Sequence, residues 1–367
     1  MNPSITSIFE EGDILHFTLN NTNVSLANGL RRTILSEIDT VVFRTETYED
    51  NQCTIYENTG RLHNEILKHR LSCIPIHSTH LETLPNHYIM ELDVTNDSET
   101  MIVVTSADFR IKNKESGNYL TEQETRKIFP ADPMTQSFID FARLRPKLGD
   151  SIPGEKIRLS CEFSVANAKV NSMFNVVSKC AYGNSPDKIK AEEMWLEISQ
   201  KLVAEGMTRE EIEFQKTNFY LLDAQRQFIP DSFDFVIQTV GVFENKEIVK
   251  KACIVLQNKF VDMIANIESD MIPIITSETT IENSYDIILE NEDYTIGKIL
   301  EYILYEKYYM GEKIASYCGF KKIHPHDLKS IIRFAYNEKT DKHMCRTHLK
   351  RVCNEAQEIF TRIYKMF

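Results

Sequence analysis

Histidines gather in one part of the chain and form the best set of candidate metal ligands. Five of the ten lie between positions 63 and 87: His63, His69, His77, His80 and His87. Imidazoles, with the nearby Cys73 thiol, are side chains that zinc and related metals prefer. Pro75 and Pro85 interrupt the run, so no single helix holds these side chains on one face. A metal-dependent enzyme using the His63–His87 region is therefore one hypothesis, and a set of surface and loop histidines is the other.

Other catalytic patterns are missing from the sequence. It contains no GxxxxGK[ST], GxGxxG or GxSxG pattern, which excludes the common phosphate-binding loops and the nucleophile elbow. Asp231 and Asp234 alternate with phenylalanines, which is typical of a strand, whereas two-metal nucleotidyl transfer needs a tighter acidic cluster. We therefore predict no catalytic residue and no cofactor.

The eight cysteines are dispersed along the chain. No two of them are two to four residues apart, the spacing that structural zinc sites use, so no metal site is predicted from them. They are Cys53, Cys73, Cys161, Cys180, Cys253, Cys318, Cys345 and Cys353. Dispersed thiols of this kind are typical of reduced, buried cysteines in a cytosolic protein.

Charge and hydropathy limit the partners of the chain. The 367 residues include 42 Lys and Arg against 54 Asp and Glu, a net charge of −12. Proteins that grip duplex DNA through phosphates need a basic surface, so we expect no direct specific DNA contact. No apolar run reaches the ~18 residues of a membrane-spanning helix, and the first residues lack the pattern of a signal peptide, so we expect no membrane contact.

The spacing of apolar residues predicts strands and helices in both the first and the last third of the chain. A strand near residues 14–19 is followed by a helix with apolar positions at helical spacing: Leu26, Ala27, Leu30, Ile34 and Ile38. Further helices are predicted at 243–267, at 294–307 and at the C-terminus. The stretch 188–220 is charged and helix-prone.

A short internal sequence similarity, called the internal echo below, relates the two ends of the chain. Residues 25–34 align with residues 295–304, since both segments begin with a hydroxyl residue, an aliphatic residue and a small residue. Each copy follows a strand, and a long apolar helix closes each one. The sequence thus suggests two homologous halves that pack together.

Two blocks carry a resemblance to a known family. Residues 24–38, VSLANGLRRTILSEI, resemble the first helix of α-type RNA polymerase subunits, and residues 58–76 resemble the family's second block, with His69-Arg70-Leu71 before an apolar-Pro step. Residues 233–241 are similar to the strand that enters the family's dimerisation helix. That family includes the bacterial α amino-terminal domain, the archaeal D subunit and the third-largest subunit of polymerase II.

The last third resembles the smaller partner of that family, the archaeal L subunit or the eleventh polymerase II subunit. Residues 292–300, EDYTIGKIL, are similar to its helix start, and residues 318–326 match its Gly-Tyr-x-x-x-His-Pro turn. Both partners on one polypeptide resemble the fused arrangement in polymerases of large cytoplasmic DNA viruses. Many eukaryotic and archaeal relatives carry a cysteine-rich metal loop in the second domain, but residues 84–100 here contain no cysteine.

The resemblance implies an α+β fold, with two halves like the α-subunit amino-terminal domain in a pseudo-twofold dimerisation core and an inserted mixed α/β domain. Residues 1–48 and 229–268 would form the first dimerisation half, 49–228 the inserted domain, and 269–367 the second, L-subunit-like half. Residues that the resemblance places at subunit interfaces are Asn28, Arg31, Arg32, His69, Arg70, Thr295, Gly297 and Leu300. In the family the arginine pair reaches towards the second-largest polymerase subunit.

The function that the resemblance implies is a non-catalytic assembly subunit of DNA-directed RNA polymerase. The two halves would form a pseudo-heterodimer within one chain and dock the two large catalytic subunits and small assembly subunits for transcription. We expect a cytoplasmic location, in a viral factory or virion, rather than the nucleus. The alternatives are the metal-dependent enzyme and a binding module unrelated to transcription.

Overall fold

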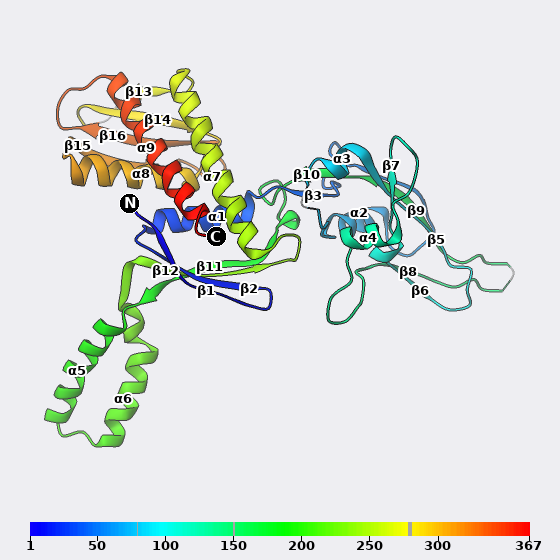
Figure 1. The fold of residues 1–367 in the computed structure, drawn as a ribbon, viewed down its shortest axis with the longest axis horizontal. Coiled ribbons are helices and arrows are strands. Elements are labelled where there is room, and N and C mark those ends of the chain that lie inside the picture. Colours follow the sequence, from blue (N-terminus) through cyan, green and yellow to red (C-terminus); the bar gives the residue numbers. More distant parts are fainter. Residues whose placement is uncertain (79, 150, 278–280) are drawn as a thin grey trace. The chain divides into compact units, whose positions relative to one another are not determined.

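The computed structural model describes residues 1–78, 80–149, 151–277 and 281–367. The chain forms two compact units (Figure 1). The first contains residues 1–33, 179–237 and 249–367, and the second contains residues 34–178 and 238–248. Each unit is an assembly of helices and sheets, so the chain has the mixed α+β character that the sequence predicts.

The first unit contains an antiparallel sheet built from strands far apart in the sequence. Its strands are β1 (Ser4–Glu11), β2 (Ile14–Asn20), β11 (Val177–Pro186) and β12 (Phe228–Thr239). They lie in the order β1-β2-β12-β11. Strand β2 alternates buried and half-buried residues, which is the pattern of a strand with one face on a core. Helix α1 (Val24–Ser36) follows β2, and helix α7 (Asn245–Glu268) follows β12.

A second sheet in this unit repeats the same arrangement. Its strands are β13 (Ile274–Thr276), β14 (Ser284–Glu290), β15 (Ala315–Lys321) and β16 (Lys329–Tyr336). They lie in the order β13-β14-β16-β15. Helix α8 (Tyr294–Leu304) follows β14, and helix α9 (Lys342–Tyr364) follows β16. In each sheet the strand that is fourth along the chain lies next to the second, and the third lies at the edge. One helix follows the second strand in the chain, and a long helix follows the fourth.

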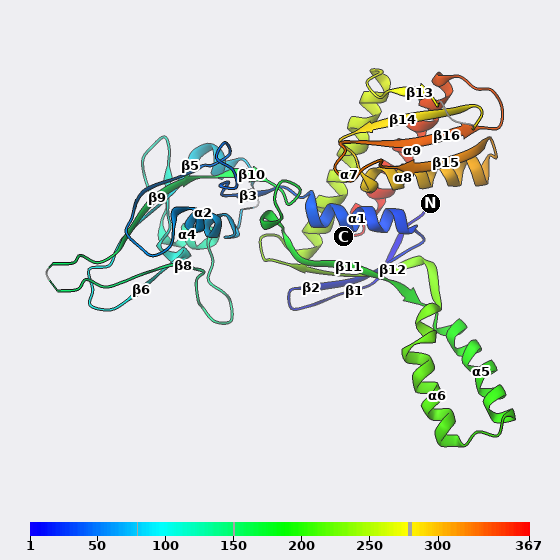
Figure 2. The same ribbon diagram turned by 180° about the vertical axis from the view of Figure 1, so that it is seen from behind.

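The two long helices α7 and α9 lie side by side in both views of the ribbon (Figures 1 and 2). The rings of Phe260 and Phe360 stack with their centroids 6.2 Å apart. Both side chains are fully buried, as are most apolar residues of the two helices at helical spacing. Ion pairs join Lys350 to Glu268 and Arg346 to Asp270 at one end of this contact.

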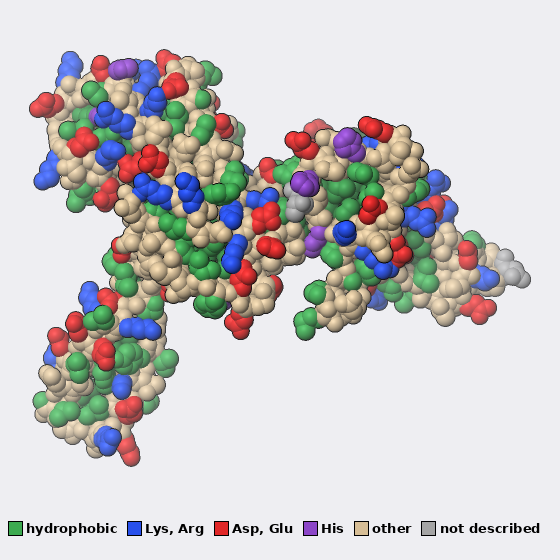
Figure 3. All heavy atoms as spheres, in the orientation of Figure 1, with side chains coloured by type: hydrophobic (Ala, Val, Ile, Leu, Met, Phe, Trp, Pro, Cys, Tyr) green, Lys and Arg blue, Asp and Glu red, His purple; other side chains and the backbone are tan. Residues whose placement is uncertain are grey.

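A two-helix hairpin interrupts the first sheet between β11 and β12. Helices α5 (Lys188–Ala204) and α6 (Arg209–Leu221) pack around a small core of Trp195 and Phe219, whose ring centroids are 5.6 Å apart. Hydrophobic side chains also lie over the outer surface of this hairpin (Figure 3). At the base of the hairpin, the backbone N–H of Asp187 donates a hydrogen bond to the carbonyl of Gln227 at 2.9 Å.

The second unit has its own core beneath a four-stranded antiparallel sheet of order β4-β9-β5-β7. Those strands are β4 (Cys53–Asn58), β5 (Tyr88–Thr95), β7 (Arg110–Asn113) and β9 (Lys156–Glu162). Two-stranded sheets pair β6 (Ile102–Thr105) with β8 (Asp140–Leu144) and β3 (Thr40–Val42) with β10 (Ser164–Ala166). The helices are α2 (Asn64–Ser72), α3 (Thr83–His87) and α4 (Glu122–Ile128).

The compact units differ from the predicted domain boundaries in three places. Residues 34–48 fall in the second unit, residues 179–228 fall in the first, and residues 238–248 fall in the second. The second difference arises because β11 pairs with β12, which ties the segment before the α5–α6 hairpin to the first sheet. Residues 278–280 of the predicted second half lie outside the described residues. Among the described helices, none combines the length and the hydropathy needed to cross a membrane.

Candidate subunit-pairing site

Helix α1 comes close to helix α8 at Gly29. A Cβ atom added at Gly29 would lie 2.6 Å from Cδ1 of Ile299 and 3.6 Å from the carbonyl oxygen of Thr295. Glycine in a helix interior is unfavourable by about 1 kcal/mol relative to alanine. The close contact with α8 gives a structural reason for a glycine at this position.

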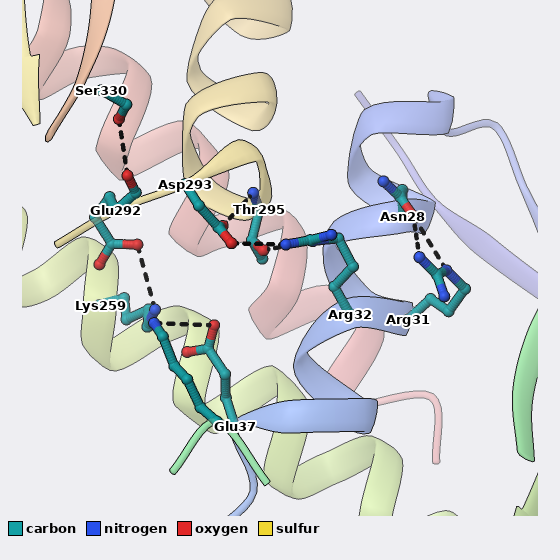
Figure 4. Close-up of polar contacts among 10 residues, drawn as sticks. Asn28, Arg31, Arg32, Glu37, Lys259, Glu292, Asp293, Thr295 and Ser330 are labelled. Carbon is teal, nitrogen blue, oxygen red and sulfur yellow. Dashed lines mark hydrogen bonds and ion pairs between the residues drawn. The ribbon is translucent and has the colours of Figure 1, made fainter. Parts of the chain in front are cut away.

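Arg32, one turn after Gly29 on α1, reaches the first turn of α8 (Figure 4). Its Nε donates to Oγ1 of Thr295 at 2.8 Å, and its Nη2 donates to Oδ2 of Asp293 at 2.6 Å. A guanidinium is suited to this task because its donors form a rigid fork. The structure therefore brings two of the predicted interface residues, Arg32 and Thr295, into direct contact within the chain.

Asp293 has two roles at this contact. It caps α8, since its Oδ1 accepts a hydrogen bond from the backbone N–H of Thr295 at 2.8 Å, and it also pairs with Arg32. Partial burial would raise the pKa of this carboxyl, but the hydrogen bonds from Thr295 and the charge of Arg32 outweigh burial and hold the pKa below 3.8. Asp293 is therefore a carboxylate that the folded state favours in its charged form.

Gly297 and Leu300 lie on the buried side of α8. Leu300 is fully buried. A Cβ atom added at Gly297 would lie 2.0 Å from Cε2 of Phe320, so the ring of this β15 residue occupies the space above the glycine. Phe320 also packs edge-on against Tyr294, with ring centroids 5.1 Å apart. Gly297 thus lets the sheet's Phe320 ring pack directly on α8, and Leu300 adds buried apolar surface to the helix.

Asn28 and Arg31 form a separate pair on α1 (Figure 4). Nε and Nη2 of Arg31 donate to Oδ1 of Asn28 at 3.1 and 2.9 Å. Both residues are half-buried. The shared acceptor holds the guanidinium along the helix, three residues from the amide, in a fixed orientation.

Polar contacts also tie α7 to the loop that precedes α8. Nζ of Lys259 lies 3.3 Å from Oε2 of Glu292, next to the Asp293 cap. The backbone carbonyl of Glu292 accepts a hydrogen bond from Oγ of Ser330 at 2.9 Å, which anchors the loop to β16 (Figure 4). The first turn of α8 is therefore held by α1, by α7 and by its own sheet.

The remaining predicted interface residues, His69 and Arg70, lie in the second unit. Both are exposed on the last turn of α2. Nη2 of Arg70 donates to the backbone carbonyl of Asp140 at 2.7 Å, which orients the guanidinium. The opposite face of α2 is buried through Leu67 and Leu71.

The candidate metal ligands at positions 63–87 are spread over several elements. His63 precedes α2 and His87 ends α3, and both are exposed. His77 is half-buried, and burial lowers its pKa. Over the described part of the chain, no three His, Cys, Asp or Glu side chains form a group that could hold a metal ion. The metal-dependent alternative gains no support from these positions, and Thr79 lies outside the described residues.

Two residues of the pairing site were not singled out from the sequence. The pattern Asp293-x-Thr295 before an apolar helical run is a recognisable cap, so Asp293 could have been found from the sequence. Phe320 carried no such signal, because its contact with Gly297 depends on how β15 returns over α8.

Comparison with known proteins agrees with this architecture. The family described as the RNA polymerase Rpb3/Rpb11 dimerisation domain matches residues 16–260. The DNA-directed RNA polymerase subunit Rpo3 of Pyrococcus horikoshii is 24% identical over 259 residues, 67% of this chain and 91% of that protein. The DNA-directed RNA polymerase II subunit RPB3 of Schizosaccharomyces pombe is 23% identical over 269 residues, 69% of this chain and 84% of that protein.

A third relative has a less specific name. A conjugation stage-specific protein of Tetrahymena thermophila is 25% identical over 289 residues, which cover 66% of this chain and 88% of that protein. The family match spans well over half of the chain and includes α1, strands β11 and β12, and most of α7. The chain belongs to the family of the RNA polymerase Rpb3/Rpb11 dimerisation domain.

Proposed function

We propose that this chain is a non-catalytic assembly subunit of DNA-directed RNA polymerase. The family match and the relatives named Rpo3 and RPB3 support this function. In the proposal the chain supplies a pairing core and docking surfaces, and the large subunits supply the catalytic chemistry.

The observation that carries the proposal is the crossing of α1 and α8. Because Gly29 has no side chain, Ile299 of α8 can pack close to the backbone of α1, and Arg32 binds the residues that cap α8. The two sheets have matching strand orders, which supports a pseudo-twofold relation between the two halves. In this proposal the second half, from residue 269, takes the place of the small L-like partner.

Pairing within one chain is the second part of the proposal. The α7–α9 contact buries apolar faces that would be costly to leave in water over so many turns. Joining the halves makes their association intramolecular, with an effective concentration on the order of millimolar. The alternative is a swapped dimer, in which the first half of one chain meets the second half of another.

The docking residues divide into two groups under this proposal. Arg32 and Thr295 serve the pairing of the halves, because their hydrogen bond joins α1 to α8, whereas Gly297 packs against Phe320 within the second half and Leu300 is buried. The group proposed to face the large subunits comprises Asn28, Arg31, His69 and Arg70. It rests on the exposure of His69 and Arg70 and on the oriented guanidiniums of Arg31 and Arg70. The proposal extends to a viral polymerase working in the cytoplasm or virion, on the resemblance to fused subunits.

Co-purification tests the proposal directly. A tagged chain expressed in its native setting is expected to bring down two large polymerase subunits in stoichiometric amounts. Arg31→Glu and Arg70→Glu should reduce that recovery, whereas Arg226→Glu, on an exposed turn after α6, should leave it unchanged. Recovery of the folded chain without large subunits would reject the function.

A further inference from the structure

Two buried cysteines face each other across neighbouring strands in the second unit. Cys53 is the first residue of β4, and Cys161 lies near the end of β9. The strands are antiparallel, and Cys53 pairs directly with Cys161 in their register. The two residues are 108 positions apart, so only the fold brings them together.

The hydrogen bonds of the ladder set the geometry of this pair. The backbone N–H of Glu162 donates to the carbonyl of Gln52 at 3.2 Å, which makes residues 52 and 162 a hydrogen-bonded pair. The next pair along the strands, Cys53 and Cys161, is then of the non-hydrogen-bonded kind, in which Cα atoms are about 4.5 Å apart and side chains are closest. Disulfides span Cα distances of about 4.4–6.8 Å. The backbone can therefore accept this bond without rearrangement.

The surroundings favour reaction at one sulfur. The neighbouring Cys161 thiol and the charge of Lys68 lower the pKa of Cys53, although burial opposes this shift. Burial raises the pKa of Cys161. Cys53 is thus the sulfur with more thiolate character, and thiolates are the reactive form of cysteine.

Access is the remaining requirement, because both side chains are only 1% exposed. Strand β4 is the edge strand of its sheet, with β9 on one side. Edge strands open locally at lower cost than central strands, since fewer contacts hold them. A small neutral oxidant can reach Cys53 through such an opening.

We propose that Cys53 and Cys161 form an oxidative modification site, at which a peroxide converts the dithiol into a cross-strand disulfide. The Cys53 thiolate attacks one peroxide oxygen, so an S–O bond forms, the O–O bond breaks and hydroxide leaves. The Cys161 sulfur then attacks the Cys53 sulfenic acid, forming the S–S bond and releasing water. The dithiol loses two electrons and two protons, and hydrogen peroxide is reduced to two water molecules.

The bond would fasten β4 to β9 beneath α2. Leu67 and Leu71 of α2 belong to the same core cluster as the two cysteines. The disulfide closes a loop of about a hundred residues, which restricts the unfolded chain and stabilises the second unit. This inference rests on the register of the sheet and is independent of the proposed function.

Disulfide mapping of the full-length chain tests the site. The reduced protein is incubated with hydrogen peroxide for several hours, its free thiols are alkylated in denaturant, and it is digested without reduction. We expect a peptide that joins Cys53 to Cys161 and that dithiothreitol separates. Oxidation of the exposed Cys73 shows in the same sample that the peroxide was active. Recovery of Cys53 and Cys161 as free alkylated thiols, or a Cys53–Cys73 bond, would overturn the inference.

Two variants separate this chemistry from general oxidation. In Cys161→Ser the oxidation of Cys53 should stop at a sulfenic acid that dimedone traps, and in Cys180→Ser, at a buried cysteine of the first unit, the Cys53–Cys161 bond should still form. Oxidation should raise the melting temperature of the second unit by roughly 5–10 °C in the wild-type chain. The same rise in Cys161→Ser would assign the stabilisation to another site.

Discussion

At the scale of single residues, Arg32 has partners within the chain that the sequence alone did not identify. The helical wheel places it opposite the apolar stripe of α1, and the family resemblance directs it towards another subunit. In the structure it binds Thr295 and Asp293, more than 260 residues away in sequence. The wheel gives the direction of a side chain from its own helix, but it contains no information on which element crosses there. The contact of Arg32 with a separate subunit stays a prediction.

Charge reversal at Arg32 should therefore affect the fold itself. Arg32→Glu places a carboxylate beside Asp293 and removes two hydrogen bonds, so we expect a loss of about 1–2 kcal/mol in the free energy of unfolding. The loss is limited because both side chains are about a third exposed and solvent screens the pair. Denaturant titration measures it, with Arg226→Glu as the control. Equal unfolding midpoints for the two variants would contradict the pairing role of Arg32.

The pKa of Asp293 gives a second residue-scale prediction. Because its folded-state pKa lies below 3.8, its charged form stabilises the fold above about pH 4, and this contribution disappears as the pH falls through the folded-state pKa. We expect wild type to be more stable than Asp293→Asn at neutral pH and the difference to shrink below pH 4. Urea unfolding of both chains across this pH range tests the sign, and a difference that grows on acidification would refute it.

At the scale of elements, helical periodicity located the long helices closely. The predicted helix 243–267 corresponds to α7 (Asn245–Glu268), and the predicted helix 294–307 begins with α8 (Tyr294–Leu304). The exposed edge strand β1 was missed, because its outward residues lack the alternation of a half-buried strand. The segment 188–220 was treated as one helix-prone stretch, although its sequence contains signals for the end of one helix and the start of another. Gly206 has a φ of +82°, and Thr208 with Glu211 forms a capping box.

The contact between α8 and β15 should be sensitive to one methyl group. Gly297→Ala gains about 1 kcal/mol in helix propensity, but its Cβ would overlap the Phe320 ring. We expect a net loss of about 1–3 kcal/mol in the free energy of unfolding, because overpacking displaces the ring. Adding Phe320→Leu to Gly297→Ala should recover part of that loss. Additive effects in this double-mutant cycle would show that the two sites do not interact.

The α5–α6 hairpin should be dispensable for folding of the first unit. Its core of Trp195 and Phe219 is local, and the backbone bond from Asp187 to Gln227 already joins its ends. Replacing residues 188–226 by a two-residue Asn-Gly turn should leave the melting temperature within a few degrees of wild type. Thermal unfolding followed by circular dichroism tests this. A deletion variant that fails to fold would show that the hairpin supports the sheet.

At the scale of the whole molecule, the echo between residues 25–34 and 295–304 was the most informative signal in the sequence. It indicated two similar halves. The two sheets of the structure share one strand order and one helix order, and the pseudo-twofold relation of the halves stays a proposal. The boundaries of the compact units were harder to predict from the sequence. They depend on β11, whose pairing with β12 spans the α5–α6 hairpin and has no local sequence signal.

Pairing within one chain leads to a prediction about mass. If the halves meet in the same polypeptide, light scattering of the purified chain should report a monomer of 42.6 kDa across dilution. A swapped arrangement requires two chains, so a stable species of twice that mass would contradict the intrachain model. Monomer mass alone does not show that the halves attract each other, and a split chain provides that test.

Residues 1–268 and 269–367, expressed as separate polypeptides, should associate one to one. The seam that would hold them includes the stacked Phe260 and Phe360, the Lys350–Glu268 ion pair and the Arg32 contacts with α8. Without the covalent link their effective concentration falls, so the complex should dissociate on dilution, unlike the intact chain. Phe360→Asp in the small fragment buries a charge at the seam and should abolish association, whereas Lys365→Asp at the exposed helix end should not. If the wild-type fragments stay apart at high concentration, or each pairs only with itself, the seam cannot be the contact that joins the two halves.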